Sequence, residues 1–564
     1  MSRTLLLGPV FAVVVLAACS SASDEAPVTP VGPEASVPEA STPDAPLADA
    51  GPSDSGPKSD AGPTCSTPTD CAALWESNAS ARYDAAMKIP ADRAAFLKAV
   101  PKGADLHNHL TGAVYAETFL GWSKAENGCI NTTTHTAVFA SGCSAATLPT
   151  PSAGAFFDEI VRAWSMKDFV PGGAETGRAH FFATFSKFGA IAGTHRDDDI
   201  ADVLKRAASE NQLYVETMFN LGQNIGDLAT PLFSGNMTPA DLPTFYDAIV
   251  GDPNFATELA KDIAVVNSAA QGYKTKLGCS GASPPDACKV GVRFIAQVAR
   301  TGANDDIFGQ MVSAFEMAAV NPNIVGVSLS SPEDDTRSLN NYALHMAMLD
   351  FLYQKYTLTG LSPLKVSTHA GELVPAYLPA GHENANTFHI RDAVQVAHAS
   401  RIGHGLDVLS ETDSALLMDE MKTKNVLVEI CLSSNDQILE VKGAAHPLAE
   451  YLKKGVPVAL ATDDQGVSRS SMAGEYARGA LEQKLTYRQL KTMARNSLEH
   501  AFLPGASMWT SVSDATPIAA CARTATMGLG DPPNAGCKAF LDASERATMQ
   551  WELERRFLAF EKTP

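Results

Sequence analysis

The sequence is poor in positive charge and in long apolar runs. Lys and Arg number 43 against 63 Asp and Glu, which gives a formal net charge of −20 over 564 residues. No basic stripe is present, so we do not expect binding to nucleic acid. Residues 20–64 contain no aromatic side chain. The apolar run from Leu5 to Leu16 is too short to span a bilayer as a helix of the mature chain.

The N-terminal region indicates export. Arg3 precedes the apolar run, and two alanines then lead into Cys19. Small residues before a cysteine are typical of a bacterial lipoprotein signal, in which residues 1–18 are removed and Cys19 is acylated. The alternative is an ordinary secretory peptide with an incidental cysteine. We predict an exported protein anchored at the cell envelope, with membrane contact only through a lipid on Cys19.

Residues 19–64 form a segment of different composition. It is rich in Pro, Ala and Ser, and it carries eight acidic residues and one basic residue, Lys58. Such a segment cannot bury enough apolar surface to fold. We predict a disordered acidic tether here, followed by a folded domain over residues 65–564.

The cysteines are consistent with an oxidising compartment. Ten are present, and apart from Cys19 and Cys431 they fall into close couples in loops rich in small and turn-forming residues. Pairing by proximity gives Cys65–Cys71, Cys129–Cys143, Cys279–Cys288 and Cys521–Cys537. Even numbers at short spacing indicate local disulfides in an exported protein. A zinc knuckle is the alternative, but the Cys-x-x-Cys spacing that it needs is missing.

Four segments have the same sequence pattern: each is an apolar run with a His or an Asp at or near its C-terminal end. They are residues 104–110, 366–373, 401–405 and 458–464. Further strand candidates are residues 213–216, 291–296, 324–329 and the run before Cys431, with helical stretches between them. This alternation is typical of a parallel (β/α)8 barrel, whose strands gather catalytic side chains at their carboxyl ends.

Several connections are predicted from the remaining patterns. Residues 72–99 and 543–561 have helical spacing, and residues 510–542 form a disulfide-closed excursion. Residues 129–143 are expected to be a surface insertion on the first connection, near the mouth of the barrel. The Phe-rich stretch over residues 156–188 is interpreted as core, although one or two of its rings could line a ligand pocket. The barrel therefore carries long loop insertions.

The polar residues at these strand ends suit a metal. His107 and His109 are two positions apart and point to one side of a strand. With His369 and Asp463 they make a nitrogen and oxygen ligand set suited to one Zn²⁺ per chain. A water on that ion would have a pKa near ~7 instead of ~15.7. Glu372, His404 and Asp464 remain as acid, base and orienting groups.

At this point the chain resembles the adenosine deaminase family. The resemblance covers roughly residues 85–510, and the lead-in Pro101-Lys102-Gly103 is similar to that of its secreted, growth-factor-related branch. The motifs are residues 102–112, His369-Ala370-Gly371-Glu372, residues 401–405, residues 431–435, Thr462-Asp463-Asp464 and residues 495–499. The resemblance implies a metal-dependent TIM-type barrel that hydrolyses adenosine to inosine and ammonia. It implies the same reaction for 2′-deoxyadenosine, with 2′-deoxyinosine as the product.

The resemblance also implies roles for single residues. Glu372 would protonate purine N1, which requires burial or a neighbouring group to raise its pKa. His404 and Asp464 would hold and deprotonate the attacking water, and Asp464 would also face the purine edge. Gly112 would let the backbone approach the ligand closely. His109, Gly112, Ser331 and Asp464 would together bind the substrate.

Two positions depart from the family pattern. Leu432-Ser433 replaces Pro-Thr, and Ser331 replaces the glycine that is expected to donate its N–H to purine N3. We predict that the contact survives if φ of Ser331 is negative, as Pro332 suggests. Cys431, Asn435 and Asn496 are interpreted as scaffold.

Three alternatives stay open. The substrate could be another aminopurine or an adenine nucleotide, or the barrel could be an exported binding or growth-factor-like protein without turnover. A two-metal hydrolase would need a bridging strand-end lysine, which is not evident. The cytidine-deaminase type of site is excluded because Pro-Cys-x-x-Cys is absent. The expected partner is a purine nucleoside, and the oligomeric state is not predicted.

Overall fold

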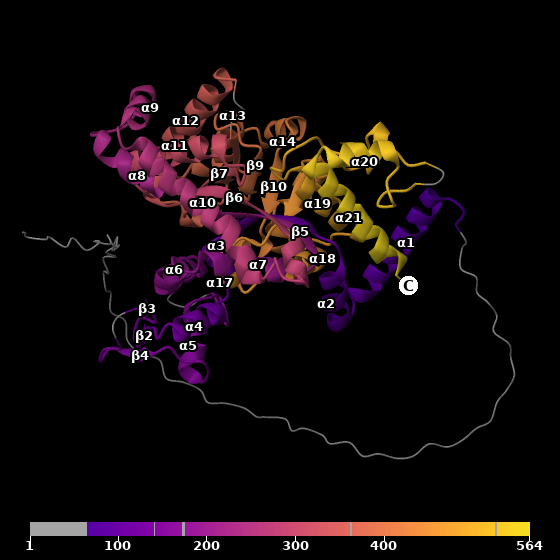
Figure 1. Ribbon diagram of the computed structural model, residues 1–564, viewed down its shortest axis with the longest axis horizontal. Helices are drawn as coiled ribbons and strands as arrows, with labels where there is room; N and C mark the ends of the chain where they lie inside the picture. Colours follow the sequence, from indigo (N-terminus) through magenta and orange to yellow (C-terminus); the bar gives the residue numbers. More distant parts are fainter. Residues whose placement is uncertain (1–64, 140–141, 172–174, 361–363, 525–526, 564) are drawn as a thin grey trace, which may run out of the picture. The chain divides into compact units, whose positions relative to one another are not determined.

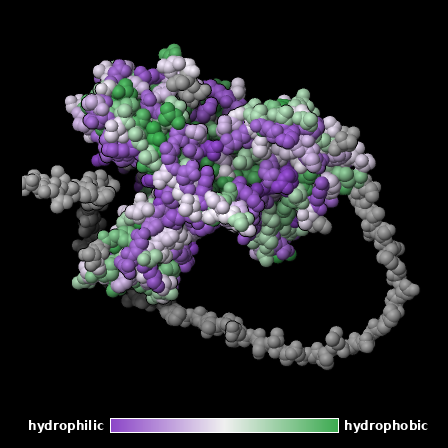
Figure 2. Space-filling view, in the orientation of Figure 1, coloured by the Kyte–Doolittle hydropathy of each residue, from purple (hydrophilic) through white to green (hydrophobic). Residues whose placement is uncertain are grey.

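The computed structural model describes residues 65–139, 142–171, 175–360, 364–524 and 527–563 (Figure 1). The predicted signal peptide, the acylated Cys19 and the acidic tether lie outside these ranges. Within them, no helix is both long and apolar enough to cross a membrane. On the face that Figure 2 shows, hydrophilic residues cover much of the surface and hydrophobic residues lie in smaller patches.

Eight parallel strands form one sheet in the order β1-β5-β6-β7-β8-β9-β10-β11. They are β1 (Gly103–His109), β5 (Gln212–Phe219), β6 (Gly291–Ala299), β7 (Ile324–Ser330), β8 (Lys365–Ala370), β9 (Arg401–His404), β10 (Leu427–Ile430) and β11 (Val458–Leu460). A bridge from Asn108 to Asp463 brings the two edges of the sheet together. The predicted (β/α)8 barrel is confirmed.

The strands are buried because helices cover the outside of the barrel and side chains fill its inside. Every residue of β1 and of β5 is buried, as expected for strands covered on both faces. β1 extends to His109, so both histidines of the His-x-His pair lie within the strand. The reason is pairing, since Asn108 and His109 lie in register with Thr217 and Met218 of β5.

The helices lie mainly between the strands. Those before and around the barrel are α1 (Pro68–Ala86), α2 (Pro90–Ala99), α7 (Arg196–Ser209), α8 (Gln223–Ala229), α9 (Leu242–Gly251), α10 (Phe255–Leu277), α11 (Asn304–Val320), α12 (Thr336–Leu358), α13 (His389–Gln395), α14 (Ser414–Thr423), α15 (Leu432–Leu439), α16 (Leu448–Lys454), α17 (Gln465–Ser468), α18 (Met472–Leu481) and α19 (Tyr487–Glu499). The helical stretch predicted over residues 72–99 is two helices. Pro90 starts the second, because proline is tolerated at a helix start and not inside one.

The connection from β1 to β5 carries an insertion with its own small core. It contains α3 (Leu110–Ala113), α4 (Ala116–Ala125), α5 (Ala155–Ala163), α6 (Gly177–Ala192) and a three-stranded sheet of β2 (Cys129–Asn131), β3 (Ala137–Val138) and β4 (Thr147–Pro149). Figure 1 shows α4, α5, α6 and this sheet gathered together. The Phe-rich stretch is largely core, since Phe181 and Phe188 are buried.

The insertion packs against the carboxyl ends of the barrel strands. Its core also contains Leu406, Leu439 and Val467, which follow β9, β10 and β11 along the chain. Carboxyl ends of parallel strands meet at one mouth of a barrel. The insertion therefore covers that mouth.

The C-terminal part of the chain packs against the N-terminal helix α1. After α19 come β12 (Trp509–Ser511), β13 (Thr516–Pro517), α20 (Ala535–Asp542) and α21 (Glu545–Lys562), and α21 packs on α1 and α19. All four predicted cysteine pairs are disulfides, with S–S distances of 1.95–2.03 Å. Among the described cysteines, only Cys431 is free.

Candidate active site

The strand ends bring the predicted residues together at the mouth of the barrel. His107 and His109 come from β1, His369 from β8, His404 from β9, and Asp463 from the turn after β11. All five are at least nine-tenths buried. Spacing along single strands predicted which side each residue faces, and the closed sheet places strands that are far apart in sequence next to one another.

Three imidazole nitrogens meet at short range. The Nε2 atom of His369 lies 3.1 Å from Nε2 of His107 and 3.0 Å from Nε2 of His109. The Oδ1 atom of Asp463 lies 3.6 Å and 3.4 Å from the same two nitrogens of β1. These four side chains thus form one compact group that could hold a metal ion.

The hydrogen bonds of the two Nδ1 atoms, in His107 and His109, determine the tautomer of each ring. Nδ1 of His107 lies 2.7 Å from a carboxylate oxygen of Glu429, and Nδ1 of His109 lies 3.0 Å from Oε1 of Gln297. Those oxygens accept only, so both rings carry their hydrogen on Nδ1. Their Nε2 lone pairs therefore face each other across the site, which is favourable only around a cation.

The geometry and the charge of the group both fit zinc. Tetrahedral ligands at the usual Zn–N distance stand about 3.3 Å apart, close to the separations found here. Burial opposes the charge of Asp463, but the neighbouring histidines hold its pKa below the ordinary value. Burial likewise opposes a positive charge at His107, yet the carboxylates of Glu429 and Asp463 lie 2.7 Å and 3.6 Å from its two ring nitrogens. The site attracts positive charge, and the four donors suit a divalent ion.

A buried network of charged residues supports the Nδ1 side of His107, which faces away from the candidate metal site. The Arg401 guanidinium contacts carboxylates of both Glu216 and Glu429 at 2.6 Å, and Ser367 donates a hydrogen bond to Glu429 at 2.8 Å. Glu429 is thereby held as a carboxylate, with its pKa below the ordinary value despite burial. Motif reading missed Glu429 and Gln297, because nothing near either residue in sequence marks it as a ligand partner.

Left-handed backbone aims several of these side chains. φ is 66° at His404, the last residue of β9, and it is 74° at Gly371 and 56° at Asp463, which follow the ends of β8 and β11. Non-glycine residues in this region cost of order 1–3 kcal/mol and are concentrated at functional sites. The chain turns sharply at these points, so that the side chains point into the mouth.

The expectation for Ser331 is wrong in its backbone conformation. Its φ is 76°, whereas we expected a negative value from the proline that follows. The turn from β7 into the next loop requires the left-handed region, and Pro332 restricts Ser331 without excluding it. Serine therefore occupies a position that suits glycine better, and it retains the N–H donor that the family pattern uses.

Glu372 has the environment of a proton donor. It is 8 % exposed, and its Oε1 lies 3.7 Å from Nε2 of His404. Burial, together with the negative charges of Asp463 and Glu333, raises the pKa of Glu372 well above its ordinary value. This shift favours the protonated carboxyl group, the form that proton donation requires.

A second buried pair fixes the turn that carries Glu372. The carboxylate of Glu333 accepts the backbone N–H of Gly371 at 3.1 Å and that of Glu372 at 2.8 Å, and Nδ1 of His389 lies 2.6 Å from it. Tyr342 stacks on the His389 ring with centroids 3.6 Å apart. Glu333 and His389 were not predicted from sequence. Glu333 stands two residues after Ser331, which is the only local signal.

The Asp464 carboxylate is buried against Gly112. Its Oδ1 has no hydrogen-bond partner within the described part of the chain. Burial and the adjacent charge of Asp463 raise its pKa well above the ordinary value. A Cβ on Gly112 would stand 1.7 Å from Oδ1 of Asp464, so the predicted close approach at Gly112 is to this carboxylate.

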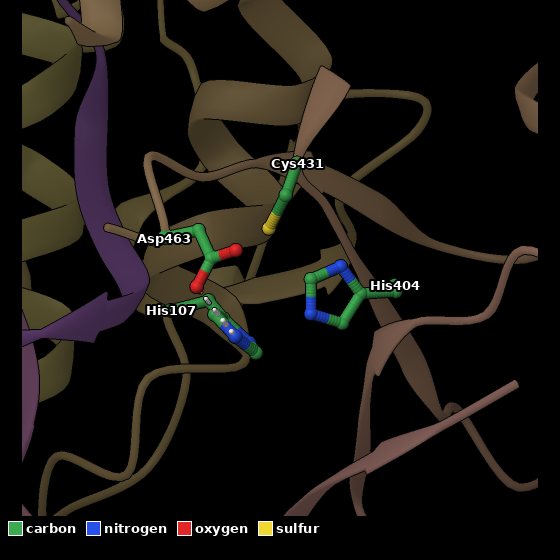
Figure 3. A group of neighbouring side chains, drawn as sticks. All are labelled: His107, His404, Cys431 and Asp463. Carbon is green, nitrogen blue, oxygen red and sulfur yellow. Dashed lines mark ion pairs between the residues drawn. The ribbon is translucent and has the colours of Figure 1, made fainter. Parts of the chain in front are cut away.

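Cys431 lies closer to the site than expected. Figure 3 shows its thiol, the His404 ring, the His107 ring and the Asp463 carboxylate pointing toward one another. One ligand atom from each lies within 4.8 Å of the others. Its hydrogen-bond partner is the Glu429 carbonyl at 3.8 Å. The thiol is buried, and burial raises its pKa well above the ordinary value, which favours the neutral thiol over the thiolate.

An ion pair fastens the insertion beside Glu372. Arg178 of α6 makes two hydrogen bonds to Asp334, at 2.6 Å and 2.5 Å. Asp334 follows β7, so the pair joins the insertion to the barrel. The Arg178 guanidinium also rests on the Phe182 ring at 5.6 Å. The carboxylate of Asp334 neutralises the positive charge of Arg178.

Residues 252–510 match the sequence profile of the adenosine deaminase family. Among curated proteins, the adenosine deaminase of Yersinia enterocolitica is 35% identical over 140 residues, which is 25% of this chain and 38% of that protein. The adenosine deaminase of Escherichia coli O1:K1 is 34% identical over 139 residues, 24% of this chain and 38% of that protein. The chain spans about two fifths of the length of these relatives.

Solved structures show weaker likeness. An adenine deaminase from Arthrobacter aurescens has 19% identity and a TM-score of 0.44, covering 72% of this chain and 95% of that one. The N6-mAMP deaminase of Arabidopsis has 18% identity and a TM-score of 0.46, covering 73% of this chain and 96% of that one. The resemblance to the secreted branch of the family stays a prediction.

Proposed function

Because the chain belongs to the adenosine deaminase family of the amidohydrolase superfamily, we propose that it is a zinc-dependent deaminase of adenosine and 2′-deoxyadenosine. The observation that carries the proposal is the meeting of three Nε2 atoms and Asp463 beside buried Glu372, whose pKa is raised. His107, His109, His369 and Asp463 would hold the ion. When bound, zinc supplies a water whose pKa falls from ~15.7 to near ~7.

The residues of the chain divide the remaining work. Glu372 gives its proton to purine N1, which makes C6 electron-poor. His404 and Asp464 orient the attacking oxygen and take up its proton. The oxygen adds to C6, the exocyclic amine leaves as ammonia, and C6 becomes the carbonyl carbon of inosine. The insertion over the mouth excludes bulk water and strengthens these interactions.

Charges near the mouth favour a nucleoside over a nucleotide. Two arginines act electrostatically on Glu372, and neither presents an exposed free donor: Arg178 is ion-paired, and the Nη1 atom of Arg300, which has no hydrogen-bond partner among the described residues, is buried. Arg178 is paired with Asp334, and Arg300 donates to the carbonyl oxygens of Ser330 and His369. A phosphate group binds tightly where charged donors are free to reach it. An uncharged ribose therefore suits this mouth better than a ribose phosphate.

The test is a spectrophotometric assay with metal analysis of the same purified sample. Adenosine, deoxyadenosine, adenine and AMP are compared. We expect about one zinc per chain and the highest kcat/KM for the two nucleosides. Higher kcat/KM for AMP or adenine would assign another aminopurine as the substrate. A zinc-loaded protein that deaminates none of the four would refute the proposal and favour a binding protein.

We also propose that the enzyme is exported and anchored through a lipid on Cys19. The four disulfides support an oxidising compartment. Mass spectrometry of the mature N-terminus from the native host decides the matter. A diacylglyceryl group on Cys19 is expected, and an unmodified terminus beyond residue 19 would mean a freely secreted enzyme.

A further inference from the structure

A chain of three hydrogen bonds runs from a helix start to His404. The backbone N–H of Leu448, the first residue of α16, donates to Nδ1 of His446 at 3.1 Å. Nε2 of His446 lies 3.2 Å from Oδ1 of Asn435, and Nδ2 of Asn435 lies 3.0 Å from Nδ1 of His404. His446, Asn435 and His404 are each at most 2 % exposed.

The first donor fixes the direction of every bond that follows. A backbone N–H can only donate, so Nδ1 of His446 must accept. Burial lowers the pKa of His446 to about 4, so the ring is neutral and carries its hydrogen on Nε2. That hydrogen goes to the amide oxygen of Asn435. The amide nitrogen of Asn435 then donates to Nδ1 of His404.

The last ring in the chain is thereby set to one tautomer. Nδ1 of His404 accepts from the amide nitrogen of Asn435 at 3.0 Å, so this nitrogen carries no hydrogen. Since Nδ1 accepts, the single hydrogen of the ring stands on Nε2, the nitrogen that faces Glu372 at 3.7 Å. A neutral imidazole that already carries this hydrogen donates to the attacking oxygen and does not accept a proton from it.

We propose that His446 and Asn435 are positioning residues that hold His404 as an Nε2–H donor. The proposal rests on the proposed function and divides the roles of the two groups that face the attacking oxygen. His404 orients that oxygen through its Nε2–H. Asp464 accepts the proton, since its Oδ1 is buried and has no hydrogen-bond partner among the described residues. The shared role predicted for His404 and Asp464 is thus split.

The sharpest perturbation is Asn435→Asp in the full-length zinc enzyme. The two side chains have nearly the same shape, but a carboxylate only accepts. It would accept from His446 as before, and it would force His404 to place its hydrogen on Nδ1. Nε2 would then lose the hydrogen that holds the oxygen. In serine proteases, a single exchange that selects the wrong histidine tautomer lowers kcat by about 10⁴-fold. We expect a loss of at least ~10²-fold in kcat here, little change in KM, and zinc content unchanged.

A spectroscopic readout tests the tautomer without relying on turnover. The ¹⁵N chemical shifts of the His404 ring in histidine-labelled enzyme distinguish a protonated from a bare nitrogen, and a His404→Asn spectrum assigns the signals. We expect a protonated Nε2 and a bare Nδ1 in the wild type, and the reverse in Asn435→Asp. A protonated Nδ1 in the wild type would overturn the proposal.

Matched variants separate positioning from general damage. Asn496→Asp makes the same exchange on a buried asparagine whose amide donates to the Val458 carbonyl, at the start of β11 and away from the mouth. It should keep kcat within about twofold. His446→Gln can accept from Leu448 and donate to Asn435, so it should retain most activity, whereas His446→Leu should not. Equal losses in all variants, or a wild-type kcat in Asn435→Asp, would refute the positioning role. A wild type inactive on every aminopurine would refute the proposed function alone, because the ¹⁵N shifts still decide the tautomer.

Discussion

Replacing Glu333 by glutamine should slow turnover because of one lost acceptor. The carboxylate receives Gly371 N–H and His389 Nδ1 on Oε1, and Glu372 N–H on Oε2. A glutamine keeps the most hydrogen bonds when its carbonyl oxygen takes the Oε1 position. Its amide nitrogen then faces the backbone N–H of Glu372, donor against donor. The turn that carries the proton donor loses its support.

The magnitude follows from that geometry. Losing one bond to a buried charged group costs about 1.5–3 kcal/mol of stability. Displacing a reacting group by about 1 Å costs as much as ~10²-fold in rate. Glu333 also supplies part of the negative charge that keeps Glu372 protonated. We expect kcat to fall by roughly 10- to 100-fold, with KM and zinc content close to wild type.

The assay is steady-state deamination of adenosine, with metal analysis and thermal unfolding of the same preparations. Glu411→Gln is the control. Glu411 is also a buried carboxylate that accepts two consecutive backbone N–H groups, those of Ile390 and Arg391, but both bind Oε1 and neither touches Glu372. It should leave kcat unchanged. The reasoning is wrong if Glu333→Gln lowers Tm yet turns over at the wild-type rate, or if both variants lose the same activity.

Four further outcomes are expected. Glu372→Gln should keep zinc and lose ~10²-fold or more in kcat, the scale of general acid catalysis, and a near-normal kcat would remove Glu372 from the mechanism. Asp463→Asn should lose zinc and activity together, because it removes a charged ligand, and full zinc occupancy would contradict the ligand set. Ser331→Gly should raise the free energy of unfolding by about 0.5–1 kcal/mol, measured in urea, because it removes left-handed strain from serine at the cost of chain entropy. If the Ser331 N–H contacts purine N3, 3-deazaadenosine should have at least ~5-fold lower kcat/KM than adenosine, and equal values would show that the contact is absent.

Local sequence was enough for the parts of the site that rest on single strands. The spacing of His107 and His109 sets both on one side of β1, because strand side chains alternate. Strand-like runs ending in His or Asp predicted the barrel, and the structure brings those ends together. Short cysteine spacings predicted all four disulfides, since small loops leave few other partners in reach.

Only the tertiary structure determined which residues hydrogen-bond to the catalytic groups and hold them in place. Glu429 is 322 residues from His107, and His389 is 56 from Glu333. No local pattern reports such pairs, because closing the barrel is what makes them neighbours. The left-handed φ of Ser331 was also beyond the sequence, since the turn after β7 overrides the preference that Pro332 imposes. The tautomer of His404 depends on a helix start 44 residues away, because a buried hydrogen bond takes its direction from its partners and not from the residue itself.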